Sequence, residues 1–181
     1  IPAYKMKYSP LLLALILLAL FGSAVQSYGQ GTFLDNFNTT SYSNNNGTAN
    51  FATNWVETNE GTSPTAGRIR IVSNQLRFNN LDGRSIARTL DLSISTAATL
   101  TLDFDATSRN NEGLRVQLWN NNTSVFETIA TINTSVTGSI THNLTADQMS
   151  AASAIRFVGV DNSWSNGEII FIDNVQFVAT S

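Results

Sequence analysis

The sequence predicts an all-β protein, an antiparallel two-sheet β-sandwich of the jelly-roll type with about nine or ten strands. Three observations predict this fold class. Short segments of alternating apolar and polar residues recur along the chain, and turn-forming residues separate them. Only 13% of the 181 residues are charged, so Asn, Thr and Ser supply much of the polarity. These three residue types compete with helical hydrogen bonds and therefore favour strands and loops.

The N-terminal segment has the layout of a secretory signal peptide, which we assign to residues 1–27. Lys5 and Lys7 precede an unbroken apolar run at 11–21, and small residues follow it. The run is shorter than the roughly 20 apolar residues that span a bilayer, so we expect cleavage and no membrane insertion afterwards. Met6 is a candidate for the true start of translation. We therefore expect an exported protein, extracellular or at the cell surface, with a single domain at 28–181.

Charge and cysteine content exclude several classes of function. The chain has no cysteine, which excludes disulfides and zinc–thiolate sites. Without the two lysines of the signal peptide, the ten basic residues become eight arginines against thirteen acidic residues, a net charge of −5. An acidic domain of this kind is a poor partner for nucleic acid or for an anionic membrane, so we expect neither.

The elements follow one another at fairly regular spacing. Residues 38–66 lack sustained periodicity and predict a long loop, and 146–151 predict a short helix. Turn signals such as Ser73-Asn74 and Asp82-Gly83 punctuate the rest. The predicted strands are 32–37, 68–72, 75–79, 85–92, 98–106, 114–119, 124–132, 137–143, 154–161 and 168–178.

Two central strands show the clearest alternation, and we expect them to form a hairpin across 107–113. In 98–106 and 114–119, apolar residues occupy every second position and predict the face toward the core: Leu100, Leu102, Phe104 and Ala106, then Leu114, Val116 and Leu118. The residues that this pattern turns outward are Asp103, Asp105, Arg115, Gln117 and Trp119.

This polar face predicts a carbohydrate site. Sugar rings stack on aromatic side chains, while carboxylates, amides and guanidinium groups bind their hydroxyls. The alternative is that the 38–66 loop covers Trp119 as a second small core. Trp164, in a loop near the C-terminus, is a further ligand-binding candidate, whereas Trp55 is expected to anchor the long loop by burial.

Two aspartates break the apolar pattern of the first and last strands. Asp35 lies between two phenylalanines, and Asp173 alternates with three apolar residues, so both are expected among core residues. An unpaired carboxylate there costs several kcal/mol. Three compensations stay open: a calcium ion shared by both aspartates and assisted by Glu57 or Glu60, local hydrogen bonds at a strand end or bulge, or an arginine partner.

Several segments resemble a module of secreted and surface proteins of bacteria. They are LDNF (34–37), ATLTLDFDATSRNNEGLRVQL (98–118), IRFVGV (155–160) and NGEIIFIDNVQF (166–177). The module is similar to concanavalin-like and carbohydrate-binding jelly rolls and, more distantly, to MAM domains, and the resemblance covers about residues 32–178. It implies a structural calcium held by the first and last strands, at Asp35 and Asp173. Such modules are often parts of longer chains, so other modules are expected partners if this chain is a fragment.

Catalytic motifs are few in this sequence. The only histidine is His142, and neither a G-x-S-x-G elbow nor an E-x-D-x-x-E pattern of paired glycosidase carboxylates occurs. We therefore expect an extracellular, non-catalytic module that binds a glycan or another cell-surface polymer. A structural repeat of a larger adhesin without a small ligand is the alternative, and a glycan-active hydrolase is a remote one.

Overall fold

The computed structural model describes residues 31–181 except 110–111, 161–163 and 165–166, so the predicted signal peptide lies outside the described residues. Within them the chain forms eleven strands and one 3-10 turn, and no described helix is long and apolar enough to cross a membrane. The elements are β1 (Gly31–Asp35), β2 (Val56–Thr58), β3 (Ile69–Val72), β4 (Gln75–Asn79), β5 (Ser85–Leu90), β6 (Ala97–Asp105), β7 (Leu114–Asn120), β8 (Val125–Ile132), β9 (Thr137–Asn143), η1 (Ala146–Gln148), β10 (Ser153–Gly159) and β11 (Ile169–Thr180).

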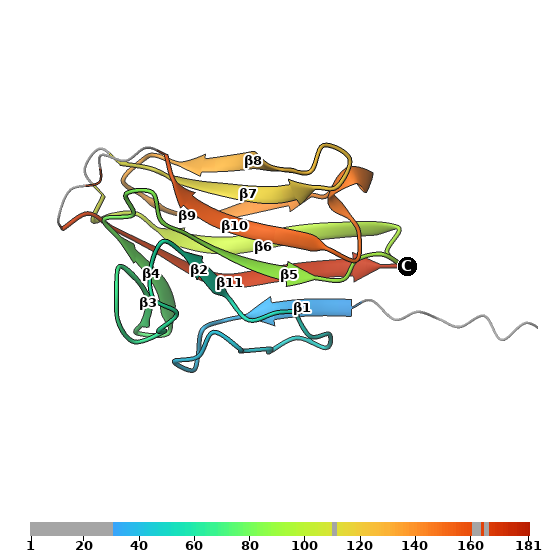
Figure 1. Ribbon diagram of the computed structural model, residues 1–181, viewed down its shortest axis with the longest axis horizontal. Helices are drawn as coiled ribbons and strands as arrows, with labels where there is room; N and C mark the ends of the chain where they lie inside the picture. Colours follow the sequence, from blue (N-terminus) through green and yellow to red (C-terminus); the bar gives the residue numbers. More distant parts are fainter. Residues whose placement is uncertain (1–30, 110–111, 161–163, 165–166) are drawn as a thin grey trace, which may run out of the picture.

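The strands form two antiparallel sheets, which confirms the predicted β-sandwich (Figure 1). The six-stranded sheet, called sheet A, has the order β3-β4-β11-β6-β9, and β1 also pairs with β11. The five-stranded sheet, called sheet B, has the order β2-β5-β10-β7-β8. Gly31 pairs with Ala179, so the first and last strands lie side by side.

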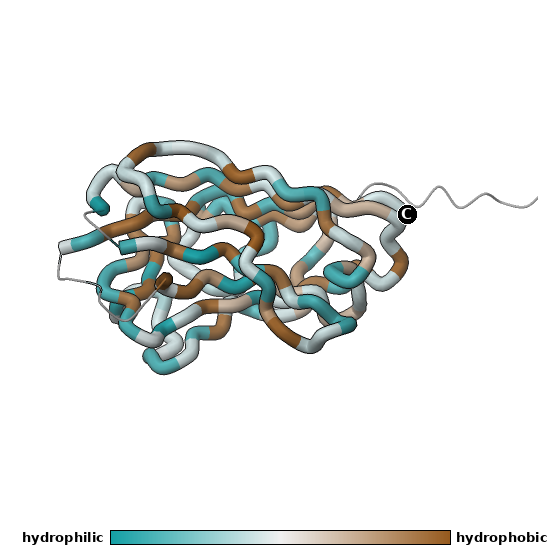
Figure 2. Tube along the Cα trace, turned by 90° about the horizontal axis from the view of Figure 1, so that it is seen from above, coloured by the Kyte–Doolittle hydropathy of each residue, from teal (hydrophilic) through white to brown (hydrophobic). Residues whose placement is uncertain are grey.

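The core lies between the sheets, and hydrophobic and hydrophilic segments alternate along the strands accordingly (Figure 2). Trp55 is buried at its centre, with ring centroids 6.1 Å from Phe37 and 5.7 Å from Phe157. This confirms that Trp55 anchors the long 38–66 segment by burial. That segment also contains β2, the one strand that its irregular sequence concealed.

The 38–66 segment runs beside β1 and is held there by backbone hydrogen bonds. The N–H of Asn46 donates to the carbonyl of Leu34 at 2.8 Å, and the N–H of Ala49 donates to that of Thr32 at 2.9 Å. Gly47 crosses so close to β1 that a Cβ atom there would lie 1.9 Å from the Thr32 carbonyl oxygen. A residue without a side chain is therefore required for this approach.

The predicted hairpin between 98–106 and 114–119 is wrong. β6 lies in sheet A between β11 and β9, whereas β7 lies in sheet B between β10 and β8. Each strand has one apolar face, and this pattern fits either layer, so alternation alone could not assign them to a sheet. The chain crosses between layers after β6, which places Asp103 and Asp105 on one outer face and Trp119 on the other. The predicted helix at 146–151 is reduced to the 3-10 turn η1.

Candidate functional site

The outward side chains of β7 form the centre of a patch on the outer face of sheet B. Trp119 pairs across the sheet with Phe126 of β8, and their ring centroids lie 5.2 Å apart in an edge-to-face arrangement. Both rings are partly exposed. The 38–66 segment runs beside β1 and then enters sheet B only as its edge strand β2, which β5 and β10 separate from β7, so it does not cover Trp119 (Figure 1).

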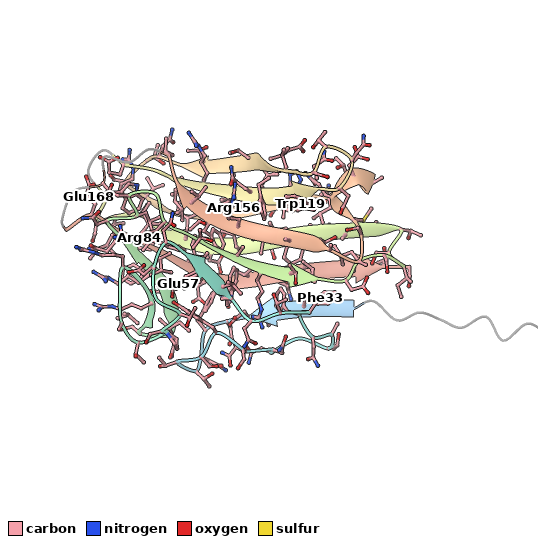
Figure 3. The ribbon with its side chains drawn as sticks, viewed as in Figure 1. Phe33, Glu57, Arg84, Trp119, Arg156 and Glu168 are labelled. Carbon is pink, nitrogen blue, oxygen red and sulfur yellow. The ribbon has the colours of Figure 1, made fainter. Side chains whose placement is uncertain are left out.

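A polar network holds the aromatic pair in place. The guanidinium carbon of Arg156, on β10, lies 4.0 Å from the ring centroid of Phe126. Its Nε donates to Oε1 of Gln117 at 2.8 Å, and Nε2 of Gln117 donates to Oγ1 of Thr128 at 3.1 Å. Trp119 and Arg156 lie on neighbouring strands of this face (Figure 3). We call Trp119, Phe126, Gln117, Arg156 and Arg115 the sheet B patch.

Arg115 supplies a cationic group at the edge of this patch. It is half-buried and lies between Thr131 of β8 and Val158 of β10 in the strand register. Among the described residues its guanidinium makes no hydrogen bond or ion pair. Three predicted ligand-binding residues, Arg115, Gln117 and Trp119, therefore share one face. Sequence reasoning missed Phe126 and Arg156. The alternation of their strands shows that both side chains point outward, but only the strand order shows that they lie beside β7.

Asp103 and Asp105 do not join that patch, because they lie on the outer face of sheet A. Asp103 accepts hydrogen bonds from Ser139 Oγ at 2.5 Å and Asn174 Nδ2 at 2.9 Å, and these lower its pKa. Asp105 accepts from the N–H and hydroxyl of Thr107 and so closes the end of its strand. The predicted joint site of these aspartates with Trp119 is therefore corrected.

Trp164 is also removed from the ligand-binding set. Its side chain is 3% exposed, and its Nε1 is buried without a hydrogen-bond partner among the described residues. Its backbone N–H donates to Asp82 Oδ1 at 3.0 Å, which ties the loop to the turn after β4. A ring buried in this way cannot stack on a sugar.

Asp35 is fully buried, as predicted, and its partner is an arginine. Nη1 of Arg88 lies 2.7 Å from its Oδ2, and both side chains are 0% exposed. Trp55 Nε1 and the Phe37 N–H also donate to the carboxylate, each at 2.9 Å. Two of the three open alternatives, the arginine partner and local hydrogen bonds, thus act together at Asp35. Arg88 alternates with Ile86 and Leu90, a signal that could have been found in the sequence.

Asp173 does not lie in the core, because a bulge changes the alternation of β11. The register with β6 shifts between Asp173 and Gln176, and Asn174 adopts a left-handed φ of 50°. Asp173 consequently lies on the outer face of sheet A, where it is the direct register partner of Asp103. Burial raises its pKa, and the nearby charges of Asp103 and Asp35 raise it further.

Calcium binding by Asp35 and Asp173 stays a prediction. Among the described residues no group of three or more His, Cys, Asp or Glu side chains is placed to hold a metal. The two assisting glutamates have other partners: Glu57 accepts from the hydroxyl of Tyr42 at 2.6 Å, and Glu60 accepts from the N–H groups of Arg68 and Ile69.

Comparison with known proteins adds to the fold. No protein-family model matches the chain, and no curated protein matches it. Among solved structures, the CBM22-1–GH10 modules of an N-terminal endo-1,4-β-D-xylanase of Clostridium thermocellum, complexed with xylohexaose, superpose with a TM-score of 0.54 at 11% identity, covering 84% of this chain and 29% of that one. A family 29 carbohydrate-binding module complexed with mannohexaose superposes with a TM-score of 0.51 at 14% identity, covering 83% of this chain and 92% of that one.

An adhesin domain has the same fold. The K3 cleaved adhesin domain of Lys-gingipain from Porphyromonas gingivalis w83 gives a TM-score of 0.51 at 13% identity, covering 83% of this chain and 99% of that one. At such identities the likeness shows the fold alone. It confirms the expected resemblance to carbohydrate-binding jelly rolls: the chain has the β-sandwich shared by carbohydrate-binding modules and an adhesin domain.

Proposed function

We propose that this chain is a non-catalytic, extracellular module that binds a glycan chain on the sheet B patch. The observation that carries the proposal is a partly exposed tryptophan held edge-to-face by Phe126, with guanidinium and amide groups fixed beside it. An exposed aromatic ring with ordered polar neighbours is the arrangement that binds the apolar face and the hydroxyls of a sugar ring.

Each group of the patch has a distinct role in this proposal. Trp119 stacks on the C–H face of one sugar ring. Arg115, which has no other partner among the described residues, donates to hydroxyl oxygens. The Gln117–Arg156 hydrogen bond fixes the rotamers of both side chains, so little conformational freedom is lost on binding.

The short side chains beside the patch suit an extended ligand. Arg156 pairs with Ala87 of β5, and Ala154 pairs with Thr89. Ala87, Thr89 and Ala154 have small side chains, so little side-chain bulk lies beside the aromatic pair on this face. A glycan chain can then lie along the patch without entering a deep pocket.

The test is binding to xylan and mannan, and to a glycan array, with Trp119→Ala as the main variant. We expect that variant to lower affinity by about tenfold or more, since loss of a stacked aromatic and its buried area is worth roughly 1–3 kcal/mol. Trp119→Phe should retain part of the affinity. Ile94→Ala, which removes a 69% exposed apolar side chain elsewhere, is the control.

The same experiment distinguishes glycan binding from the second candidate function, a structural or adhesive module without a small ligand. If the wild type binds no glycan on the array, the sheet B proposal fails and a structural or adhesive module is favoured. Equal binding by the wild type and Trp119→Ala would move the glycan site away from this patch.

A further inference from the structure

Four of the eight arginines outside the signal peptide gather at one hollow, although the domain has a net negative charge. The hollow has a volume of about 510 Å³ and lies at the β3–β4 edge of sheet A. Nitrogen-tipped side chains project from this end of the molecule (Figure 3). The arginines, here called the arginine cluster, are Arg68, Arg70, Arg77 and Arg84.

Two members of the cluster lie side by side, and no described acidic group pairs with their positive charges. Arg70 and Arg77 are direct partners in the antiparallel β3–β4 pair, and like charges in that position are destabilising. Neither makes a hydrogen bond or ion pair with another described residue, and the Nε atom of Arg70 is buried without a partner. A buried donor without an acceptor is costly, so an anionic ligand would relieve both penalties.

The remaining members are already held in position. Arg84 Nη1 donates to the carbonyl oxygens of Asn80 and Asp82, each at 3.3 Å, and Arg68 Nη1 donates to Asn79 Oδ1 at 3.3 Å. Glu60 also lines the hollow, but its carboxylate accepts from backbone N–H groups. Burial, followed by the charges of Arg70 and Arg68, lowers the pKa of Arg77.

An aromatic ring continues the row beyond the arginines. Arg77 pairs with Phe171 of β11, and Phe171 pairs with Asp105 of β6. The row across the outer face of sheet A is thus Arg70, Arg77, Phe171 and Asp105. Phe171 is partly exposed and offers a stacking surface beside the cations. A ligand that carries both an anionic group and a ring matches this row better than a free anion.

We infer that the arginine cluster binds the anionic groups of an acidic polysaccharide, with one sugar ring stacked on Phe171. Guanidinium groups bind carboxylates and sulfates in the same forked geometry, so uronate and sulfated sugars are the two sources of one ligand chemistry. This site goes beyond the proposed function because it uses the other outer face, and it rests on that function only in taking the ligand to be a glycan.

The experiment measures binding of polygalacturonate, which carries carboxylates, and dextran sulfate by titration calorimetry at low and high salt. We expect the wild type to bind at least one of them, and R70Q/R77Q to weaken that binding by about tenfold or more. R70K/R77K keeps the positive charges but loses the forked guanidinium geometry, so its affinity should lie between those of the wild type and R70Q/R77Q. The polymer that binds identifies the anionic group.

A matched control separates a local site from the overall charge. I94E/T141E lowers the net charge by the same amount at exposed positions away from β3 and β4, and it should change affinity by less than about twofold. Thermal melting checks folding. R70Q/R77Q should melt no lower than the wild type, because a like-charge pair has been removed.

Three outcomes would overturn the inference: no binding of either acidic polymer, equal weakening in the control, or duplex DNA bound as tightly as the polysaccharide and lost in the same variants. The outcomes for the sheet B patch are separate. Neutral mannan or xylan bound through Trp119 without acidic polymers would leave the proposed function standing and this inference refuted. Acidic polymers bound through the arginine cluster, without binding of neutral mannan or xylan, would support this inference and refute the proposed function of the sheet B patch.

Discussion

Replacement of Arg88 by methionine removes the only ion-pair partner recorded for Asp35 among the described residues, while a side chain of similar length is kept. The lost contacts are the 2.7 Å ion pair to Asp35, a 2.9 Å hydrogen bond to the carbonyl of Thr53, and a 2.7 Å hydrogen bond to that of Asn44. The guanidinium also lies 4.0 Å from the ring centroid of Phe51. One substitution therefore leaves a carboxylate without its counter-charge in the core.

The expected loss is large. Removal of one partner of a fully buried ion pair costs about 3–5 kcal/mol, because the other charge stays buried and uncompensated. At roughly 2–4 °C per kcal/mol for a domain of this size, the melting midpoint should fall by about 6–20 °C. Arg115→Met, at a half-buried arginine with no recorded partner, is the control and should change stability by about 0.5 kcal/mol or less.

A double-mutant cycle measures the interaction energy between Asp35 and Arg88 separately from the loss of stability in each single variant. Burial raises the pKa of Asp35 and lowers that of Arg88 to about 10, so desolvation is the largest influence on both groups. The double variant Asp35→Asn/Arg88→Met should then be less destabilised than the sum of its single variants, by roughly 1–3 kcal/mol. Urea denaturation followed by tryptophan fluorescence measures all four proteins. A loss below about 1 kcal/mol in Arg88→Met, or strict additivity, would refute the reasoning.

Three further predictions concern pH, packing and calcium. Burial raises the pKa of Glu57 from 4.5 to about 7. The stability that Glu57 contributes should therefore be fully present below about pH 4.5 and fall by roughly 2 kcal/mol as pH rises through 7, and Glu57→Gln should abolish this part of the pH dependence in melting scans. Gly47→Ala should cost about 2–3 kcal/mol in urea denaturation, because its Cβ would meet the β1 backbone, whereas Gly61→Ala, with open space, should not. A chelator should leave the melting midpoint unchanged, because Arg88 already neutralises Asp35; a lower midpoint would favour the calcium hypothesis instead.

Strand positions were predictable because alternation depends on a local property, the period of two. Strands such as β3, β4 and β9 begin and end within about a residue of their predicted limits. The partners of each strand were not predictable, since β6 and β7 have the same apolar face and differ only in the sheet that they join. The error at the predicted hairpin therefore passed directly into the predicted ligand face.

The two aspartates show the limit of alternation within one strand. Asp35 precedes any irregularity in β1, and its predicted burial is confirmed. Asp173 lies beside a bulge, and one extra residue inverts the faces of everything that follows. Val175 and Phe177 are in the core as predicted, but Asp173 is on the opposite side of the sheet from them. A positive φ at a non-glycine residue, here Asn174, leaves only a weak signal in sequence.

The two candidate surfaces are physically independent, and this independence can be measured. Trp119 lies on the outer face of sheet B and Arg77 on the outer face of sheet A, with the packed core between them. Facing sheets lie about 10 Å apart, so side chains on opposite outer faces share no contact. Substitutions at the two sites should therefore change binding free energies additively for a ligand that occupies both faces. For a ligand that occupies one face, only one of the two substitutions should have any effect.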